Sequence, residues 1–199
     1  MATLTYQGHG SFRLQSANGY TIYVDPYAGE GYDAPGDLIL VTHQHHDHNQ
    51  ISLCARKPDC LIATETDALK DGIHQKLLFG AVTVEAVQAS NKNHQPDQCV
   101  GYIITIDSVS LYAAGDTSTT EQMQEMSALQ LDYALLPCDG IYNMDLEEAA
   151  ACAVLIGAKN NIPIHLKPGA LFDRSRAESW TAPNRIVIEP GQTIELVHS

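Results

Sequence analysis

The sequence predicts an α+β protein built from two similar halves whose sheets stack on each other. Short apolar runs of strand length recur between turn residues, and helical patterns are few. The stretch 20–25 followed by 37–43 also resembles the stretch 109–116 followed by 132–139. Each pair offers a strand that ends in Asp and then an apolar strand that opens on a polar loop. Stacking two such halves would bring these loops to one shared edge.

The first half is expected to be mainly strands. Alternating or apolar runs predict strands at 3–6, 12–15, 21–24, 38–40 and 61–63. Asn18-Gly19 is a strong signal for a hairpin between the second and third of these. A short helix is expected over 51–56, stopped before Pro58, and a weak one over 66–70.

The second half adds strands and two longer helical segments. Strands are predicted at 82–87, 100–106, 110–114, 131–136, 162–164, 185–188 and 193–197. A helix is predicted over 122–129. Another should begin at Asp145, which with Glu148 has the pattern of a capping box, and run to Ile156.

Composition limits the possible partners. The chain has 199 residues, 44% of them hydrophobic, which is enough for one well-packed domain over 1–199. Eleven Lys and Arg against 24 Asp and Glu give a net charge of −13, which argues against a nucleic-acid partner. No apolar run approaches the roughly 20 residues that span a bilayer, and no signal-peptide pattern opens the chain. No membrane partner is therefore expected.

The five cysteines favour a reducing compartment. Their number is odd and their spacing wide, which fits the cytoplasm better than a disulfide framework. Most are expected to be small core residues. Cys99 and Cys138 fall near loops that carry candidate site residues, and either could contact the site.

Four histidines and an aspartate gather within the segment His43-Gln44-His45-His46-Asp47-His48. The apolar run 38–40 before it indicates a buried strand that delivers these side chains. Imidazole and carboxylate are ligands for zinc and similar ions, and a packed core offers few partners to so many imidazoles. A surface His-rich tract or an expression tag is the alternative, but a tag would not lie mid-chain directly after a buried strand.

The segment has the form His-x-His-x-Asp-His and resembles the signature of the metallo-β-lactamase superfamily of metal-dependent hydrolases. Gly115-Asp116-Thr117 is similar to a second motif of that family, and His165, after the short strand 162–164, to a third. The resemblance covers nearly the whole chain and implies the family's α+β fold, a four-layer αββα sandwich. The run 135–144 looks like a compact branch that includes uncharacterised zinc-dependent hydrolases related to a sugar-phosphate lactonase. Two residues depart from that branch: Asn143, where Thr is common, and Leu166, where Tyr often follows the histidine.

The resemblance also implies a ligand set for two divalent ions. Position by position it comprises two groups and a bridge: His43, His45 and His94 for one ion, Asp47, His48 and His165 for the second, and Asp116 between them. His94 is assigned to this set because it lies in the polar loop after the strand 82–87, and the family has its third histidine in the corresponding loop. Asp47 and Asp116 are the expected catalytic residues, and Asp47 could also hold or move a proton.

Other residues are expected around these ligands. Asp25 resembles an aspartate that lies beneath the metals and orients a ligand, and Asp139 is expected to support the site as well. His9, flanked by two glycines, is interpreted as a loop histidine with its own hydrogen bonds; a place at the edge of the site is the alternative. Lys167 and Arg174 are interpreted as solvated, with contact to an anionic substrate at the rim as the alternative.

The implied function is a metal-dependent hydrolase in which metal-bound hydroxide attacks a small ester, lactone or phosphodiester. The expected cofactors are two divalent ions, zinc in the first place, with manganese or iron as alternatives. Two other functions remain: an iron-dependent redox enzyme on the same scaffold, or a non-catalytic metal-binding module. The expected partner is a small-molecule substrate, and the sequence does not determine the oligomeric state.

Overall fold

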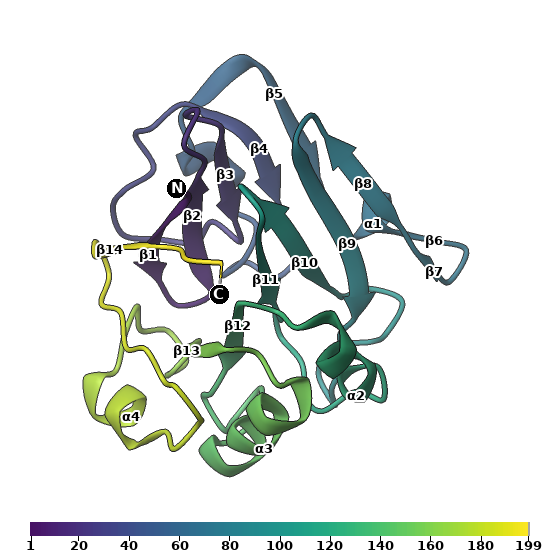
Figure 1. Ribbon diagram of the computed structural model, residues 1–199, viewed down its shortest axis with the longest axis vertical. Coiled ribbons are helices and arrows are strands. Elements are labelled where there is room, and N and C mark those ends of the chain that lie inside the picture. Colours follow the sequence, from purple (N-terminus) through teal and green to yellow (C-terminus); the bar gives the residue numbers. More distant parts are fainter. Residues whose placement is uncertain (199) are drawn as a thin grey trace.

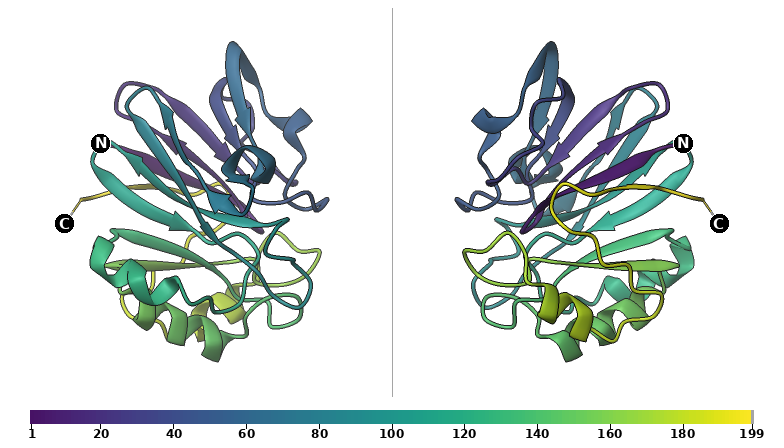
Figure 2. Two further views of the ribbon diagram at one scale, coloured as in Figure 1. Left: turned by 90° about the vertical axis from the view of Figure 1, so that its right-hand side faces the viewer. Right: turned by 90° about the vertical axis from the view of Figure 1, so that its left-hand side faces the viewer.

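Two six-stranded sheets stack in the computed structural model, which describes residues 1–198 (Figures 1 and 2). The first sheet has the order β14 (Thr193–Glu195), β1 (Thr3–Gly8), β2 (Ser11–Gln15), β3 (Thr21–Val24), β4 (Gly36–Leu40), β5 (Arg56–Ala63). The second has the order β13 (Asn160–Ile164), β12 (Tyr133–Pro137), β11 (Val109–Ala113), β10 (Val100–Ile106), β9 (Val82–Gln88), β8 (Lys76–Phe79). The α+β sandwich expected from the sequence is confirmed.

The central strands of the second sheet are buried on both faces, and strand β12 shows why the sequence of such a strand is continuously apolar. Tyr133 and Leu135 point into the core between the two sheets, whereas Ala134 and Leu136 point into a second core beneath the helices. Successive side chains of a strand point to opposite faces, so a strand covered on both sides carries no polar face.

The helices cover the outer face of this second sheet (Figure 1). They are α2 (Met123–Met126) with the 3₁₀ turn Ser127–Leu129, α3 (Leu146–Ile156) and α4 (Arg174–Ser179). In α3 the Asp145 side chain caps the helix by accepting from the Glu148 amide at 2.8 Å. The predicted capping box is therefore half formed, because the Glu148 carboxylate accepts from Thr119 instead.

The outer layer over the first sheet is thin. A small cluster of Tyr23, Tyr32, Ile39 and neighbours lies there beneath a loop and the 3₁₀ turn Ile51–Leu53. Helix α1 (Glu65–Ala68) and the small hairpin of β6 (Leu69–Lys70) and β7 (Ile73–His74) follow strand β5. No helix among residues 1–198 is long and apolar enough to cross a membrane.

The faint internal repeat of the sequence is a structural repeat. Strands β3 and β4 pair in parallel in the first sheet, as β11 and β12 do in the second. At equivalent places Asp37 accepts from the Thr21 amide at 2.8 Å and Asp132 from the Ser110 amide at 2.9 Å. A lysine pairs with each of the two aspartates. The repeat places the two sets of loops at the same edge of the sandwich.

Several predicted elements are wrong in extent or type. The helix expected over 51–56 ends at Leu53, and Arg56–Ala63 form β5, where Pro58 is tolerated because β5 is an edge strand. The strand expected over 185–188 is a single bridge between Arg185 and Asn161. Strand β8 and helix α4 were not predicted, because both are short and lack a strong period.

Candidate metal centre

The predicted site residues all follow strands that run in the same direction within their sheets. Strands β1, β3 and β4 lead to His9, Asp25 and His43 in the first sheet. Strands β9, β11, β12 and β13 lead to the loops that carry His94, Asp116, Asp139 and His165 in the second. The carboxyl ends of the strands of both sheets therefore meet at one edge, which is where α/β proteins commonly bind ligands.

The first group of predicted ligands converges. The imidazole nitrogens of His43, His45 and His94 lie within 4.8 Å of one another. His94 Nε2 lies 3.0 Å from His45 Nδ1, a contact in which two ring nitrogens face each other. His43 and His94 are buried and His45 is exposed, so the group opens to solvent on one side.

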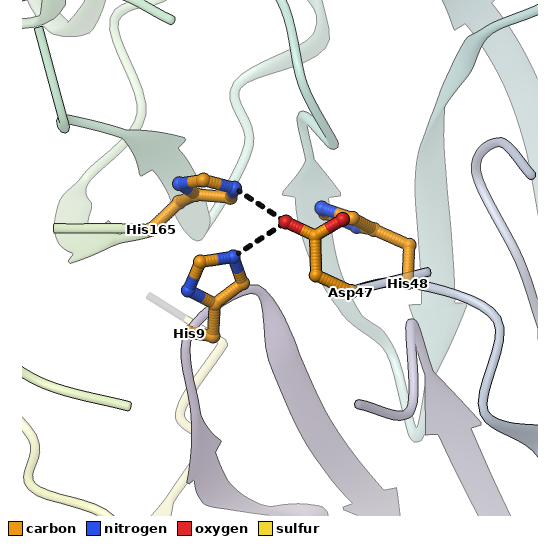
Figure 3. Close-up of side chains that lie close together, drawn as sticks. All are labelled: His9, Asp47, His48 and His165. Carbon is orange, nitrogen blue, oxygen red and sulfur yellow. Dashed lines mark hydrogen bonds and ion pairs between the residues drawn. The ribbon is translucent and has the colours of Figure 1, made fainter. Parts of the chain in front are cut away.

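The second group converges as well, with one member more than the sequence predicted (Figure 3). Ligand atoms of Asp47, His48 and His165 lie within 4.8 Å of one another, and His9 belongs to the same cluster. Figure 3 shows that the rings of His9 and His165 both point at one oxygen of Asp47, Oδ2, at 3.0 Å and 3.6 Å.

Asp116 lies between the two groups, where a bridging ligand was predicted. The residue is 3% exposed. Oδ1 lies 3.2 Å from His48 Nε2, and Oδ2 lies 3.4 Å from Nε2 of both His94 and His165. One carboxylate thus reaches histidines of both groups, as a shared ligand requires.

Asp25 supports the site from below. It accepts from the Thr42 amide and hydroxyl, each at 2.7 Å, and lies 2.9 Å from His48 Nδ1. Because the Thr42 hydroxyl donates to Asp25, it accepts from His43 Nδ1 at 3.0 Å. Both histidines therefore carry their proton on Nδ1 and present Nε2 to the centre, which is how protein structures fix metal-binding tautomers.

A second chain of contacts joins ligands of the two groups. His94 Nδ1 meets Asn91 Oδ1 at 2.8 Å, and Asn91 Nδ2 donates to Asn143 Oδ1 at 2.9 Å. Asn143 Nδ2 donates to Asp139 Oδ2 at 2.8 Å, and that same oxygen lies 2.9 Å from His165 Nδ1. Asn143, one of the two residues that depart from the related pattern, links the two halves of this series of contacts.

His9 is the main site residue that the sequence interpretation undervalued. It is fully buried, and its backbone has a positive φ of 57°. Its carbonyl accepts from the His165 amide at 2.8 Å, and the two rings pack with centroids 3.7 Å apart. His9 Nδ1 meets the Ala170 carbonyl at 3.1 Å, which orients Nε2 towards Asp47. The alternative of a place at the site is therefore the correct one.

Charges in the centre are strongly coupled. Burial, and after it the charge of His48, lowers the pKa of His43 to about 2, so this imidazole is neutral. Burial alone would lower the pKa of His48, but Asp116 and Asp25 raise it well above its usual range. Burial alone would raise the pKa of Asp116, but His48 and His165 hold it well below its usual range. The negative carboxylates thus stabilise positive charge between the two ligand groups. In the metal-free protein, protons on the histidines supply that charge.

The donor set fits divalent metal ions. Among the described residues, Nε2 of His43, His48 and His165 and Oδ1 of Asp116 are buried without a hydrogen bond. Buried polar atoms normally form hydrogen bonds. These four form none, and three of them have only the longer charge contacts given above, which favours a bound cation between them. Five histidines and two carboxylates are ligands suited to zinc, manganese or iron.

Other predicted residues lie outside the centre. Lys167 is exposed, and Arg174 is exposed and ion-paired with Glu178 and Glu189. All five cysteines are free. The Cys99 thiol donates to the Asp116 carbonyl at 3.4 Å, and burial, then Asp116 and Asp25, raise the pKa of Cys99 well above its usual range. Cys99 is thus a neutral packing residue beside the site.

The chain is similar to known proteins along most of its length. A family model described as a beta-lactamase superfamily domain matches residues 3–165. A metal-dependent hydrolase of Methanoculleus marisnigri is 32% identical over 217 aligned positions, covering 97% of this chain and 96% of that protein. One of Nitratidesulfovibrio vulgaris is 32% identical over 189 positions, covering 81% and 79%. A solved structure from Parabacteroides distasonis, named as a metal-dependent hydrolase, has a TM-score of 0.75 at 29% identity, covering 94% of this chain and 93% of that chain.

Proposed function

This chain belongs to the beta-lactamase superfamily and is a metal-dependent hydrolase, and from that premise we propose that it uses two divalent ions, zinc in the first place, to hydrolyse a small ester, lactone or phosphodiester. The proposal rests on one observation. A cluster of three histidines and a cluster of three histidines with Asp47 both reach one buried carboxylate, that of Asp116. That arrangement supports one ion in each cluster with Asp116 as their shared ligand.

The ions would provide the electrophile and the nucleophile. When bound, divalent ions polarise a substrate oxygen and lower the pKa of a coordinated water from 15.7 to about 7. No serine or cysteine nucleophile is needed, which agrees with the burial of Cys99 and Cys138. The protein's part is to hold the ligands, position the substrate and move protons.

Asp47 is the residue placed to move a proton. Its side chain is 34% exposed, whereas Asp116 is buried, and it lines a cleft of about 310 Å³ together with Asp116, Asn93 and Tyr142. Oδ2 is held by His9 at 3.0 Å, which leaves Oδ1 to accept the proton of the attacking water and to pass it to the leaving group.

The rim of this cleft is built to orient a substrate. Asn93 Nδ2 donates to the Tyr142 carbonyl at 3.0 Å, which ties the loop that carries His94 to the loop that carries Asp139. The Tyr142 side chain is half exposed and lies at the mouth of the cleft. An apolar ring beside polar ligands is a common way to hold a small substrate.

A substrate panel tests the proposal. Protein loaded with zinc should hydrolyse at least one of p-nitrophenyl acetate, γ-butyrolactone and bis(p-nitrophenyl) phosphate, measured by chromogenic or acid-release assay. Removing the metal with a chelator should abolish that turnover, and zinc should restore it. Turnover that survives complete metal removal would contradict the proposal, and so would metal-loaded protein that hydrolyses none of the three classes.

A further inference from the structure

Beside the first ligand group lies a second pocket, of about 230 Å³, which the proposed chemistry does not use. Three ligand histidines form one wall: His43, His45 and His94. The other walls are amide-rich, with one carboxylate: Gln44, Asn93, Gln95, Gln98 and Glu65. The volume lies below the roughly 300–1,000 Å³ of pockets that hold drug-sized ligands, so this pocket suits only one small group of a substrate.

Glu65 is the unusual residue of this pocket. It follows the carboxyl end of β5 and is 9% exposed. Its Oε2 accepts from Gln44 Nε2 at 2.9 Å, and no described residue donates to its Oε1. A buried carboxylate is costly unless it is paired, and one neutral amide is a weak partner for it.

When the charges of the site are counted, the negative charge of Glu65 has no cation to balance it. Four carboxylates contact the ligand cluster or belong to it: Asp25, Asp47, Asp116 and Asp139. Two divalent ions would neutralise these four negative charges, and the negative charge of Glu65 would remain. No Lys or Arg lines this pocket or the cleft of Asp47, and the chain as a whole carries −13. The electrostatic potential at the site therefore favours binding of a cationic group and disfavours binding of an anionic one.

We propose that this pocket recognises a substrate's ammonium group through Glu65, with the Gln and Asn amides around it as further acceptors. This inference rests on the proposed function and names its substrate class: a small ester or lactone with an amino group a few bonds from the scissile carbonyl. The carbonyl lies at the metals, and the ammonium enters the Glu65 pocket. A substrate with a phosphate at that place is rejected because it would face a carboxylate that forms no ion pair with a described Lys or Arg.

Three matched hydroxamates test the proposal by binding, without turnover. Each anchors on metal through the same group, and they differ only at the far end: β-alanine hydroxamate carries an ammonium, butyrohydroxamate a methyl, and succinic monohydroxamate a carboxylate. Titration calorimetry on zinc-loaded protein should give about tenfold tighter binding of the first than of the second. The third should bind more weakly than the second.

The Glu65→Gln variant isolates the charge. Its amide oxygen can still accept from Gln44, so the loop stays supported while the ammonium preference should disappear. Glu125→Gln, an exposed change on α2, is the matched control and should keep the preference. Equal binding of β-alanine hydroxamate and butyrohydroxamate to the unmodified protein would overturn the inference, as would a preference that survives Glu65→Gln. Protein that takes up no zinc by elemental analysis would instead overturn the proposed function, and this inference with it.

Discussion

The Asp116→Asn variant is expected to lose both metal ions and to fall in turnover by about 10³-fold or more. Asp116 is buried and lies within 3.4 Å of histidines from both ligand groups. An amide cannot supply the negative charge that holds two cations close together. Metal content by elemental mass spectrometry and turnover on the best substrate of the panel would measure both effects.

The fold should survive this change, because the core strands do not depend on Asp116. Circular dichroism of the variant should match that of the metal-free parent. Asp107→Asn is the matched control: Asp107 lies in the β10–β11 turn at the opposite end of the sandwich, so that variant should keep both ions and full turnover. Two ions per chain in Asp116→Asn would contradict the role of a shared ligand.

The His9→Met variant is expected to bind the second ion roughly 10–100-fold more weakly, as when other groups that orient metal ligands are removed. His9 holds Asp47 Oδ2 at 3.0 Å and packs on His165, so Asp47 and His165 lose a fixed position without it. The first ion should stay, because none of His43, His45 and His94 contacts His9. The measurement is a chelator titration of the cobalt-loaded protein. The visible absorption of the bound cobalt reports the loss of each ion separately.

A second variant separates orientation from packing. His9→Gln places an amide donor near the position of Nε2 and should recover much of the lost affinity, whereas methionine fills a similar volume without a donor. The positive φ of 57° is unfavourable for Gln and Met alike, so backbone strain cancels in the comparison. Equal affinity for the second ion in both variants would mean that His9 only packs.

The seven predicted ligand positions came from the family resemblance, and local patterns agree with it at all of them except His94. His43 to His48 follow a buried strand, Asp116 ends a strand in a turn, and His165 follows the short β13. The stacking of two sheets could be predicted because the two halves repeat, and the family resemblance implied the αββα sandwich. Asp25 and Asp139 contact His48 and His165, as expected for residues behind the ligands.

The supporting residues could not be predicted in the same way, because tertiary contacts decide them. His9 reaches the centre only because its backbone bonds to His165 and to Leu171, more than 150 positions away in the sequence. Asn91 and Asn143 are ordinary loop residues until their two loops meet. The paired glycines around His9 were the one local signal for a constrained backbone. Likewise, Pro58 argued against a strand locally, and only the edge position of β5 permits it.

The number and identity of metal ions per chain is the measurement that tests the central claim most directly. Elemental mass spectrometry on protein purified without chelator or histidine tag should find about two divalent ions per chain, zinc in the first place. Two irons would keep the binuclear centre and move its chemistry towards the redox alternative. No ion, with none taken up on titration with zinc, manganese or iron, would contradict the account, because the seven ligand side chains would then not form a metal site.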